Sequence, residues 1–309
     1  MSSIAEKPDE DTPAGFALGV TAYGLWGVIP LFFRLLDGVP LLAILAHRAW
    51  WSFVILLATI VVCKRGAAVR AVLANRRACL LLALSTLLIA SNWCTYIYAV
   101  SIEQVVQAGL GYFITPLANV LLGVLVLGER LRRLQIVALV AAAAGVVVLT
   151  IHGGEVPWIA ISLVASFSLY GLVRKVVAAD ALVGLFVETL FLAPAALAYL
   201  GYLSATSTGT STAFVFERDW LLLATGPITT VPLVCFAGAA RRLRMTTLGF
   251  LQFLTPTMQV AVAIFLFGEP FTASHRWAFP LIWVAVVLYI TDAVRTVRQR
   301  RINDTQPQP

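Results

Sequence analysis

The chain has 309 residues, of which 60% are hydrophobic and only 12% are charged, and its formal net charge is +7. Soluble domains carry about 25% charged residues and still expose much of their surface to water, so this composition excludes both a soluble globular protein and a disordered one. The mean hydropathy of +0.91 indicates that the main partner of the chain is a lipid bilayer.

Apolar runs of about 20 residues recur along the whole chain. Runs this long predict helices, because the strands of a membrane barrel alternate polar and apolar residues over about ten positions. The polar residues before the first run have neither the basic start nor the cleavage site of a secretory signal peptide, so we expect that run to be a retained span. We therefore predict an all-α polytopic membrane protein with ten transmembrane helices. In chain order, the predicted spans are Gly15–Phe33, Leu41–Val62, Ala78–Val100, Val106–Leu127, Gln135–Ile151, Val156–Val173, Leu182–Tyr202, Trp220–Ala239, Thr247–Phe267 and Ala278–Val294.

The distribution of basic residues predicts how these spans are oriented. With the N-terminus placed inside, 18 of the 22 lysines and arginines fall in cytoplasmic segments, whereas the outer loops hold only Arg34, Arg218 and Arg276. Cytoplasmic loops carry such an excess of basic residues, so we expect both termini to be cytoplasmic. The cations then face anionic lipid headgroups, and the positive net charge requires no nucleic-acid partner.

The chain also contains an internal repeat. The segment Gly109–Pro116, followed by Gly128-Glu129, recurs 140 residues later as Gly249–Pro256, followed by Gly268-Glu269. Because each half holds five spans, an odd number, the second half enters the membrane from the opposite side. Inverted repeats are typical of secondary transporters, whose substrate site lies at mid-membrane between the halves. The predicted boundaries are a first repeat at 14–151, a second repeat at 152–296, and cytoplasmic tails at 1–13 and 297–309.

Several motifs, in this order and spacing, carry a resemblance to a known family. They are Ala22–Gly27 with Pro30, His47-Arg48 with Trp51-Ser52, Asn92-Trp93, Leu110–Pro116 with Leu127–Arg130, Ser168–Lys175, Thr230–Leu233 and Thr247–Phe250. Over residues 14–296 the chain resembles the drug/metabolite transporter superfamily, with its paired EamA domains, and within it the RarD (chloramphenicol-sensitive protein) type of permease. The resemblance implies a multi-pass permease of the bacterial inner membrane. Family members often have Glu-Ala-Ser and Asn where this chain has Gln107-Ala-Gly109 and Thr115, and the missing carboxylate puts ion coupling at position 107 in doubt.

Few ionisable residues lie deep within the spans. A charge in the bilayer costs at least ~2.5–3.5 kcal/mol, so such residues face a cavity or a partner. Arg48 and Glu188 occupy equivalent positions of the two repeats, but their expected depths differ by roughly 9 Å, which disfavours a direct pair. The alternatives are that Arg48 reaches Glu103 or a carbonyl while Glu188 meets Arg174, or that both residues only stabilise the fold.

If transport is linked to protons, one of these groups must change its charge. Arg48 stays protonated at any relevant pH, and the neighbouring His47 is more readily explained as a structural histidine than as a proton shuttle. Glu188 is the remaining deep carboxylate and is our candidate for the coupling site.

Aromatic, amide and hydroxyl residues gather near helix-breaking prolines in both halves. Proline removes a helical hydrogen bond and frees a carbonyl, so prolines at matching places predict hinges and a substrate site, while helix packing is the competing interpretation. The candidate hinges are Pro30, Pro116, Pro232 and Pro256. The candidate residues of the substrate cavity are Tyr23, Trp26, His47, Arg48, Asn92, Trp93, Tyr96, Gln107, Tyr112, Thr115, Tyr170, Thr229, Thr230, Gln252 and Thr255.

These features favour a secondary transporter that moves a small metabolite, an amino-acid-like or a drug-like solute by alternating access. None of the three lysines follows a glycine, so there is no Walker A loop for ATP. No catalytic motif is present, the four cysteines lack metal-ligand spacing, and we expect neither catalysis, nor a cofactor, nor a metal. A membrane-embedded enzyme and a non-transporting receptor or assembly protein are the alternatives. Substrate, direction, coupling ion and oligomeric state stay open.

Overall fold

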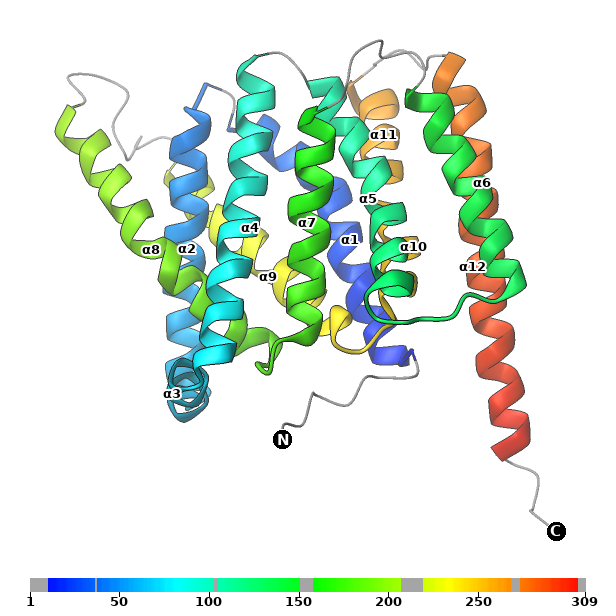
Figure 1. Ribbon diagram of the computed structural model, residues 1–309. Coiled ribbons are helices and arrows are strands. Elements are labelled where there is room, and N and C mark those ends of the chain that lie inside the picture. Colours follow the sequence, from blue (N-terminus) through cyan, green and yellow to red (C-terminus); the bar gives the residue numbers. More distant parts are fainter. Residues whose placement is uncertain are drawn as a thin grey trace.

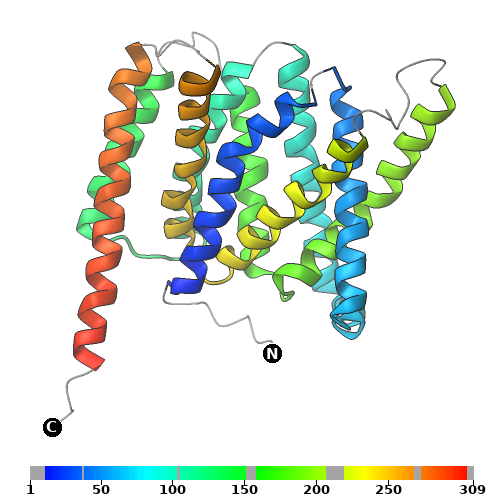
Figure 2. The ribbon, with the colours of Figure 1, turned by 180° about the vertical axis from the view of Figure 1, so that it is seen from behind.

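The computed structural model describes residues 11–36, 38–102, 105–150, 158–206, 219–267 and 273–304. Every regular element in these ranges is a helix, and the helices form one bundle (Figures 1 and 2). They are α1 (Pro13–Arg34), α2 (Leu41–Val62), α3 (Gly66–Ala74), α4 (Arg76–Ser101), α5 (Val105–Leu125), α6 (Arg133–Thr150), α7 (Trp158–Val176), α8 (Ala181–Thr206), α9 (Asp219–Ala240), α10 (Met245–Gln252), α11 (Leu254–Phe267) and α12 (Ala273–Asp304).

Seven helical stretches of the described residues are long and apolar enough to cross a membrane, and two further apolar helices, Gly109–Leu125 and Arg133–Val148, are shorter. The prediction of an all-α, multi-pass membrane protein is therefore confirmed. The number of ten spans stays a prediction.

The long helices alternate in direction along the chain (Figure 1). Helix α1 starts at the same end of the bundle at which α12 finishes, and we name this the basal end. The connection from α1 to α2 lies at the other end, which we name the distal end.

Two local features differ from the predicted elements. The predicted span Thr247–Phe267 is divided into α10 and α11 by a turn at Phe253. The division lies one helical turn before Pro256, which has no N–H to donate to the carbonyl of Gln252 and whose ring crowds that turn. The short helix α3 occupies the connection after α2, which the sequence analysis treats as a loop.

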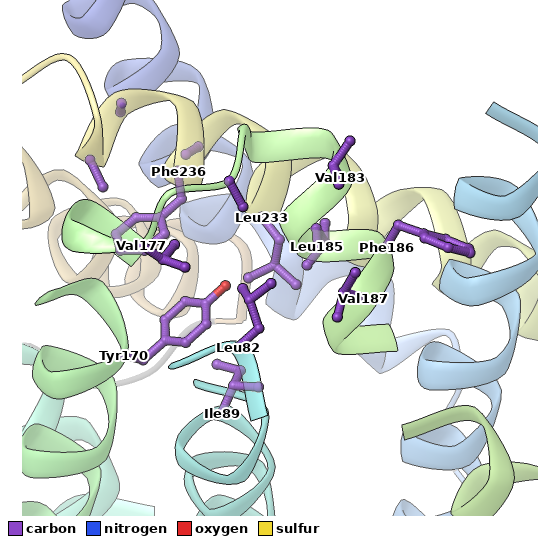
Figure 3. Close-up of a cluster of buried hydrophobic side chains, with 14 of the residues drawn as sticks. Leu82, Ile89, Tyr170, Val177, Val183, Leu185, Phe186, Val187, Leu233 and Phe236 are labelled. Carbon is purple, nitrogen blue, oxygen red and sulfur yellow. The ribbon is translucent and has the colours of Figure 1, made fainter. Parts of the chain in front are cut away.

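Aromatic side chains from three helices form the centre of the bundle. Tyr23 and Trp26 of α1 contact Phe236 of α9, which stacks on Tyr170 of α7 with ring centroids 5.8 Å apart. Figure 3 shows Tyr170 and Phe236 among aliphatic side chains from α4, α8 and α9. A second buried cluster joins α5, α6, α10 and α12.

The repeated glycines at 109 and 249 lie in different surroundings. A Cβ on Gly249 would come within 2.6 Å of the backbone oxygen of Pro116, where α10 crosses α5, whereas a Cβ on Gly109 would meet nothing within 4 Å. Backbone cannot move aside as a flexible side chain can, so only Gly249 must remain without a side chain.

We predict that Gly249→Ala lowers the thermal unfolding temperature of the purified protein, because overpacking costs about 1–3 kcal/mol. Gly109→Ala is the matched control and is expected to leave stability unchanged or to raise it by about 0.5–1 kcal/mol through helix propensity. Equal unfolding temperatures for both variants would contradict the close crossing of α5 and α10.

A second prediction concerns the two ends of the bundle. Arg70 on α3 lies at the basal end and Ser204 near the end of α8 lies at the distal end, and both are exposed. Single cysteines at these positions, in a variant without native thiols, should react with a membrane-impermeant reagent from opposite sides of the membrane. Labelling of both from one side would contradict the arrangement in Figure 1.

Candidate functional site

A cavity of about 910 Å³ lies between helices from both halves of the chain, namely α1, α2, α4 and α5 from the first half and α7, α9, α10 and α11 from the second. It reaches the distal end, where Arg34, Gly38 and Val39 form part of its wall. Its size falls within the range of about 300–1,000 Å³ that small-molecule sites occupy.

The structure brings ten of the predicted cavity residues into this wall. They are Tyr23, Trp26, Arg48, Asn92, Trp93, Tyr96, Tyr112, Thr115, Gln252 and Thr255, together with the prolines Pro30 and Pro256. The sequence analysis missed Gln259, although Gln252, Thr255 and Gln259 recur at helical spacing and form one polar stripe that could have identified it.

Other predicted residues lie outside this wall. Tyr170 and Thr229 line a smaller neighbouring pocket together with Glu188. His47, Thr230, Pro116 and Pro232 line neither of the two cavities, and the side chain of Gln107 lies outside the described residues.

Arg48 is held by the second half of the chain. Its Nε donates to Thr229 Oγ1 at 3.0 Å, and its guanidinium carbon lies 4.8 Å from the Trp93 ring centroid and 5.4 Å from that of Phe33. Such positions over ring faces allow cation–π attraction. Arg48 thus contacts a hydroxyl and two rings rather than Glu188. Glu103, the other acidic partner considered for Arg48, lies outside the described residues.

Glu188 meets Arg174, which was one of the alternatives left open by the sequence. Arg174 Nη1 lies 3.4 Å from Glu188 Oε1, and both side chains are almost fully buried. The carboxylate also accepts hydrogen bonds from Ser85 Oγ at 2.5 Å and from Tyr170 at 3.4 Å. These donors compensate for the loss of water around a buried charge.

His47 is fully buried and its Nδ1 accepts a hydrogen bond from Trp51 Nε1 at 3.2 Å, one helical turn further along α2. This contact supports the structural interpretation of His47.

Several polar side chains of the cavity wall also join helices. Pro30 has no N–H to donate to the carbonyl of Trp26, and Gln259 Nε2 donates to that oxygen at 3.2 Å. Thr255 Oγ1 donates to the backbone oxygen of Tyr23 at 2.8 Å, so α11 is bonded twice to α1. Asn92 Nδ2 similarly donates to Leu163 O on α7 at 3.0 Å.

The basal end is closed by bonds between the two halves. Glu129 accepts hydrogen bonds from the backbone N–H groups of Met245 at 2.6 Å and Thr246 at 2.9 Å, the first residues of α10. A carboxylate at a helix N-terminus satisfies free N–H groups and faces the positive end of the helix dipole. Gly123 leaves room for it, since a Cβ there would lie 2.7 Å from Glu129 Oε2.

Asp11 also forms hydrogen bonds between the two halves at the basal end. It accepts from the backbone N–H of Arg244 at 2.7 Å and from Thr247 Oγ1 at 2.6 Å. Burial alone would lower the pKa of the Arg244 guanidinium, whereas Tyr289, Asp11 and Glu129 raise it, and the balance is a pKa above the ordinary value. Arg244 is therefore a permanent cation between these acids.

Two further links between the halves also lie at the basal end. Arg65 forms an ion pair with Asp180, and Gln135 Nε2 donates to Asp292 at 2.9 Å. Tyr23 and Trp26 belong both to the cavity wall and to the aromatic cluster around Phe236.

Comparison with known proteins places this architecture in a family. Residues 13–151 match the EamA-like transporter family. An uncharacterized transporter of Vibrio cholerae is 42% identical over 93% of this chain and 96% of its own length. The protein RarD of Escherichia coli K12 is 39% identical over 94% of this chain and 98% of its own. The chain belongs to the EamA-like transporter family. It is a RarD-type permease of the drug/metabolite transporter superfamily, as its motifs suggest.

Further matches support the same conclusion. The chloramphenicol-sensitive protein RarD of Pseudomonas aeruginosa is 31% identical over 93% of this chain and 96% of its own. A protein of known crystal structure is 19% identical with a TM-score of 0.70, over 91% of this chain and 98% of its own, and this likeness shows the fold alone. Relatives in Vibrio cholerae, Pseudomonas aeruginosa and Bacillus subtilis are each named an uncharacterized transporter.

Proposed function

We propose that this protein is a secondary, ATP-independent transporter that moves a small metabolite, amino-acid-like or drug-like solute across the bacterial inner membrane by alternating access. The observation that carries the proposal is the cavity itself. It lies between the halves and reaches the distal end, whereas at the basal end hydrogen bonds and an ion pair join the two halves.

The contacts between helices support two inverted repeats at 14–151 and 152–296. If α1 is paired with α7, α2 with α8, α4 with α9, α5 with α10–α11, and α6 with α12, the partners run in opposite directions in Figure 1. The contacts between helices also match when each helix is replaced by its partner in the other repeat. The contact of α5 with α7 then corresponds to that of α11 with α1, and the contact of α1 with α9 corresponds to that of α7 with α4. Helix α2 packs on α8 and α6 packs on α12, as partners related by a twofold axis would.

The charges support an orientation. The basal end carries Arg65, Arg132, Lys175 and Arg241, and cytoplasmic segments are rich in Lys and Arg. Both termini are then cytoplasmic, and the cavity faces the outside of the cell. Movement of the two repeats against each other would close the distal end and open the basal one.

Transport itself is tested with purified protein in liposomes. Labelled amino acids, simple carboxylic acids and amphenicols are offered with and without a pH gradient and without ATP. Saturable protein-dependent flux of a solute is expected. If every solute crosses at the rate seen with empty liposomes, the result contradicts the transport proposal and favours a receptor or an assembly protein.

The bond of Glu129 to α10 yields a prediction about the basal end. Glu129→Ala should open this end more often, because loss of a helix cap costs about 0.5–2 kcal/mol. A cysteine at the buried position Thr246 should then react faster with an impermeant thiol reagent. The background is a variant without native thiols.

Arg130→Ala, at the exposed neighbouring position, is the control for this experiment and should leave the reaction rate unchanged. An unchanged rate with Glu129→Ala as well would mean that Glu129 does not hold the basal end closed.

Glu188 remains our candidate for proton coupling. The pocket beside it shares Ile89, Trp93 and Leu233 with the wall of the large cavity, so one layer of side chains separates the carboxylate from the solute site. A buried carboxylate this close could change its charge as the solute binds. The ion pair with Arg174 supports the competing structural role equally well.

We predict that Glu188→Gln retains solute binding and exchange but loses accumulation driven by a pH gradient. Flux in liposomes and binding in detergent are measured in parallel. Tyr170→Phe, which removes one hydrogen bond to Glu188 but no charge, should keep the accumulation. If Glu188→Gln still concentrates the solute, Glu188 is structural.

A further inference from the structure

The two terminal nitrogens of Arg48, in the cavity wall, have no hydrogen-bond acceptor among the described residues. Nε is bonded to Thr229, but Nη1 and Nη2 make no hydrogen bond to any described residue. The side chain is half-buried and forms part of the cavity wall. A guanidinium in the membrane interior is costly without an acceptor. The four N–H groups of Nη1 and Nη2, which no described residue accepts, are therefore available to a molecule in the cavity.

Two phenol groups lie beside this guanidinium. Tyr96 and Tyr112 line the same cavity wall as Arg48, and their ring centroids are 6.2 Å apart. Neither hydroxyl makes a hydrogen bond within the described part of the chain. A guanidinium edge and two O–H donors together match the oxygens of a carboxylate, which accepts several hydrogen bonds at once.

We propose that the cavity binds an amphipathic monocarboxylate, with its carboxylate on Nη1 and Nη2 of Arg48 and its apolar body against Trp93, Tyr96 and Tyr112. This inference rests on the proposed function only in treating the cavity as a solute site.

The charge of the wall favours an anion. Among the described lining residues there is no aspartate or glutamate, while Arg34 stands at the distal mouth and Arg48 lies deeper. An apolar cavity lined by one sign of charge attracts the opposite sign and repels organic cations. The deeper part of the wall holds a single guanidinium, so the second charge of a dianion would be buried there without a partner.

The orientation of Arg48 is fixed before any ligand arrives. Thr229 holds Nε, and Trp93 and Phe33 lie along the planar group at 4.8 and 5.4 Å from its carbon. A guanidinium ordered in this way loses little side-chain entropy when it binds a carboxylate. The rings of Trp93 and Tyr96 are at the same time the surface on which an apolar body can lie.

The test compares four probes with one phenyl body: 3-phenylpropanoate, its neutral amide, 3-phenylpropylammonium and phenylalanine. Binding to the purified full-length protein in lipid nanodiscs is measured by calorimetry and by quenching of tryptophan fluorescence. The carboxylate should bind about tenfold more tightly than the amide, the value of one charge-assisted hydrogen-bonded pair. The ammonium should bind most weakly.

The amino acid distinguishes two sources of the carboxylate. Binding of phenylalanine as tight as that of 3-phenylpropanoate assigns amino acids to the site, and weaker binding assigns simple carboxylic acids; both results support recognition of a carboxylate. Equal affinity for the carboxylate and the amide, or no carboxylate binding at millimolar concentration, overturns the inference.

Variants assign the effect to Arg48. Arg48→Gln should weaken carboxylate binding about tenfold and leave amide binding unchanged, and Arg48→Lys should retain part of the preference. Arg70→Gln, at an exposed position of α3, is the matched control. If Arg48→Gln does not fold, Thr229→Val replaces it, because this variant removes the acceptor for Nε. It is expected to lower the ratio of the affinity for the carboxylate to the affinity for the amide. If these variants leave the ratio of carboxylate to amide affinity unchanged, Arg48 does not bind the carboxylate.

Failure of this inference is distinguishable from failure of the transport proposal. Selective binding of the carboxylate without flux in liposomes would retain the site and reject transport. Equal flux of amide and carboxylate, unaffected by Arg48→Gln, would reject the site and retain transport.

Discussion

In the interior of a bilayer no water is available to a polar group, so each freed carbonyl and each buried charge must find its partner within the protein. This constraint explains why the polar residues of the cavity wall also join the helices. Pro30 frees the carbonyl of Trp26, and the partner comes from Gln259, 233 positions away on α11. Glu188 and Arg174 are paired with each other inside the core. Polar groups of the cavity wall, such as Thr255 and Gln259, therefore also hold the helices together.

The same constraint separates what the sequence predicts from what it does not. Long apolar runs have one stable form in lipid, so the long helices could be located from these runs, whereas the short helix α3 and the break at Phe253 could not. Polar and aromatic residues near Pro30 and Pro256 line the cavity as predicted, whereas Thr229 and Thr230 near Pro232 do not. Adjacency in sequence was less informative: His47 and Arg48 are neighbours on α2, but successive helical residues point about 100° apart. Arg48 faces the cavity, whereas His47 is buried against Trp51.

Contacts between distant segments lie beyond such local patterns. Gly128-Glu129 stands out in the sequence as half of a repeated motif, yet nothing nearby indicates that its carboxylate caps α10. The N-cap residue of α10, Arg244, makes no side-chain bond to the helix, so the first half of the chain supplies the cap that the second half lacks. The partner of Arg48, Thr229, is likewise 181 positions away. These pairings depend on how the halves are packed, which the local sequence does not encode.

The two Thr-Pro motifs illustrate this dependence most directly. In the first half, Thr115 bonds back to Gly111 of its own helix, and α5 continues through Pro116. In the second half, Thr255 bonds to the backbone of Tyr23 on α1, and the helix is interrupted at Phe253. Both dipeptides are helical, but the first hydroxyl bonds within its own helix while the second bonds to a neighbouring helix, and only the second dipeptide follows a break. Under alternating access, unlike conformations of the two repeats are also what keeps one end of the cavity open while the other is closed.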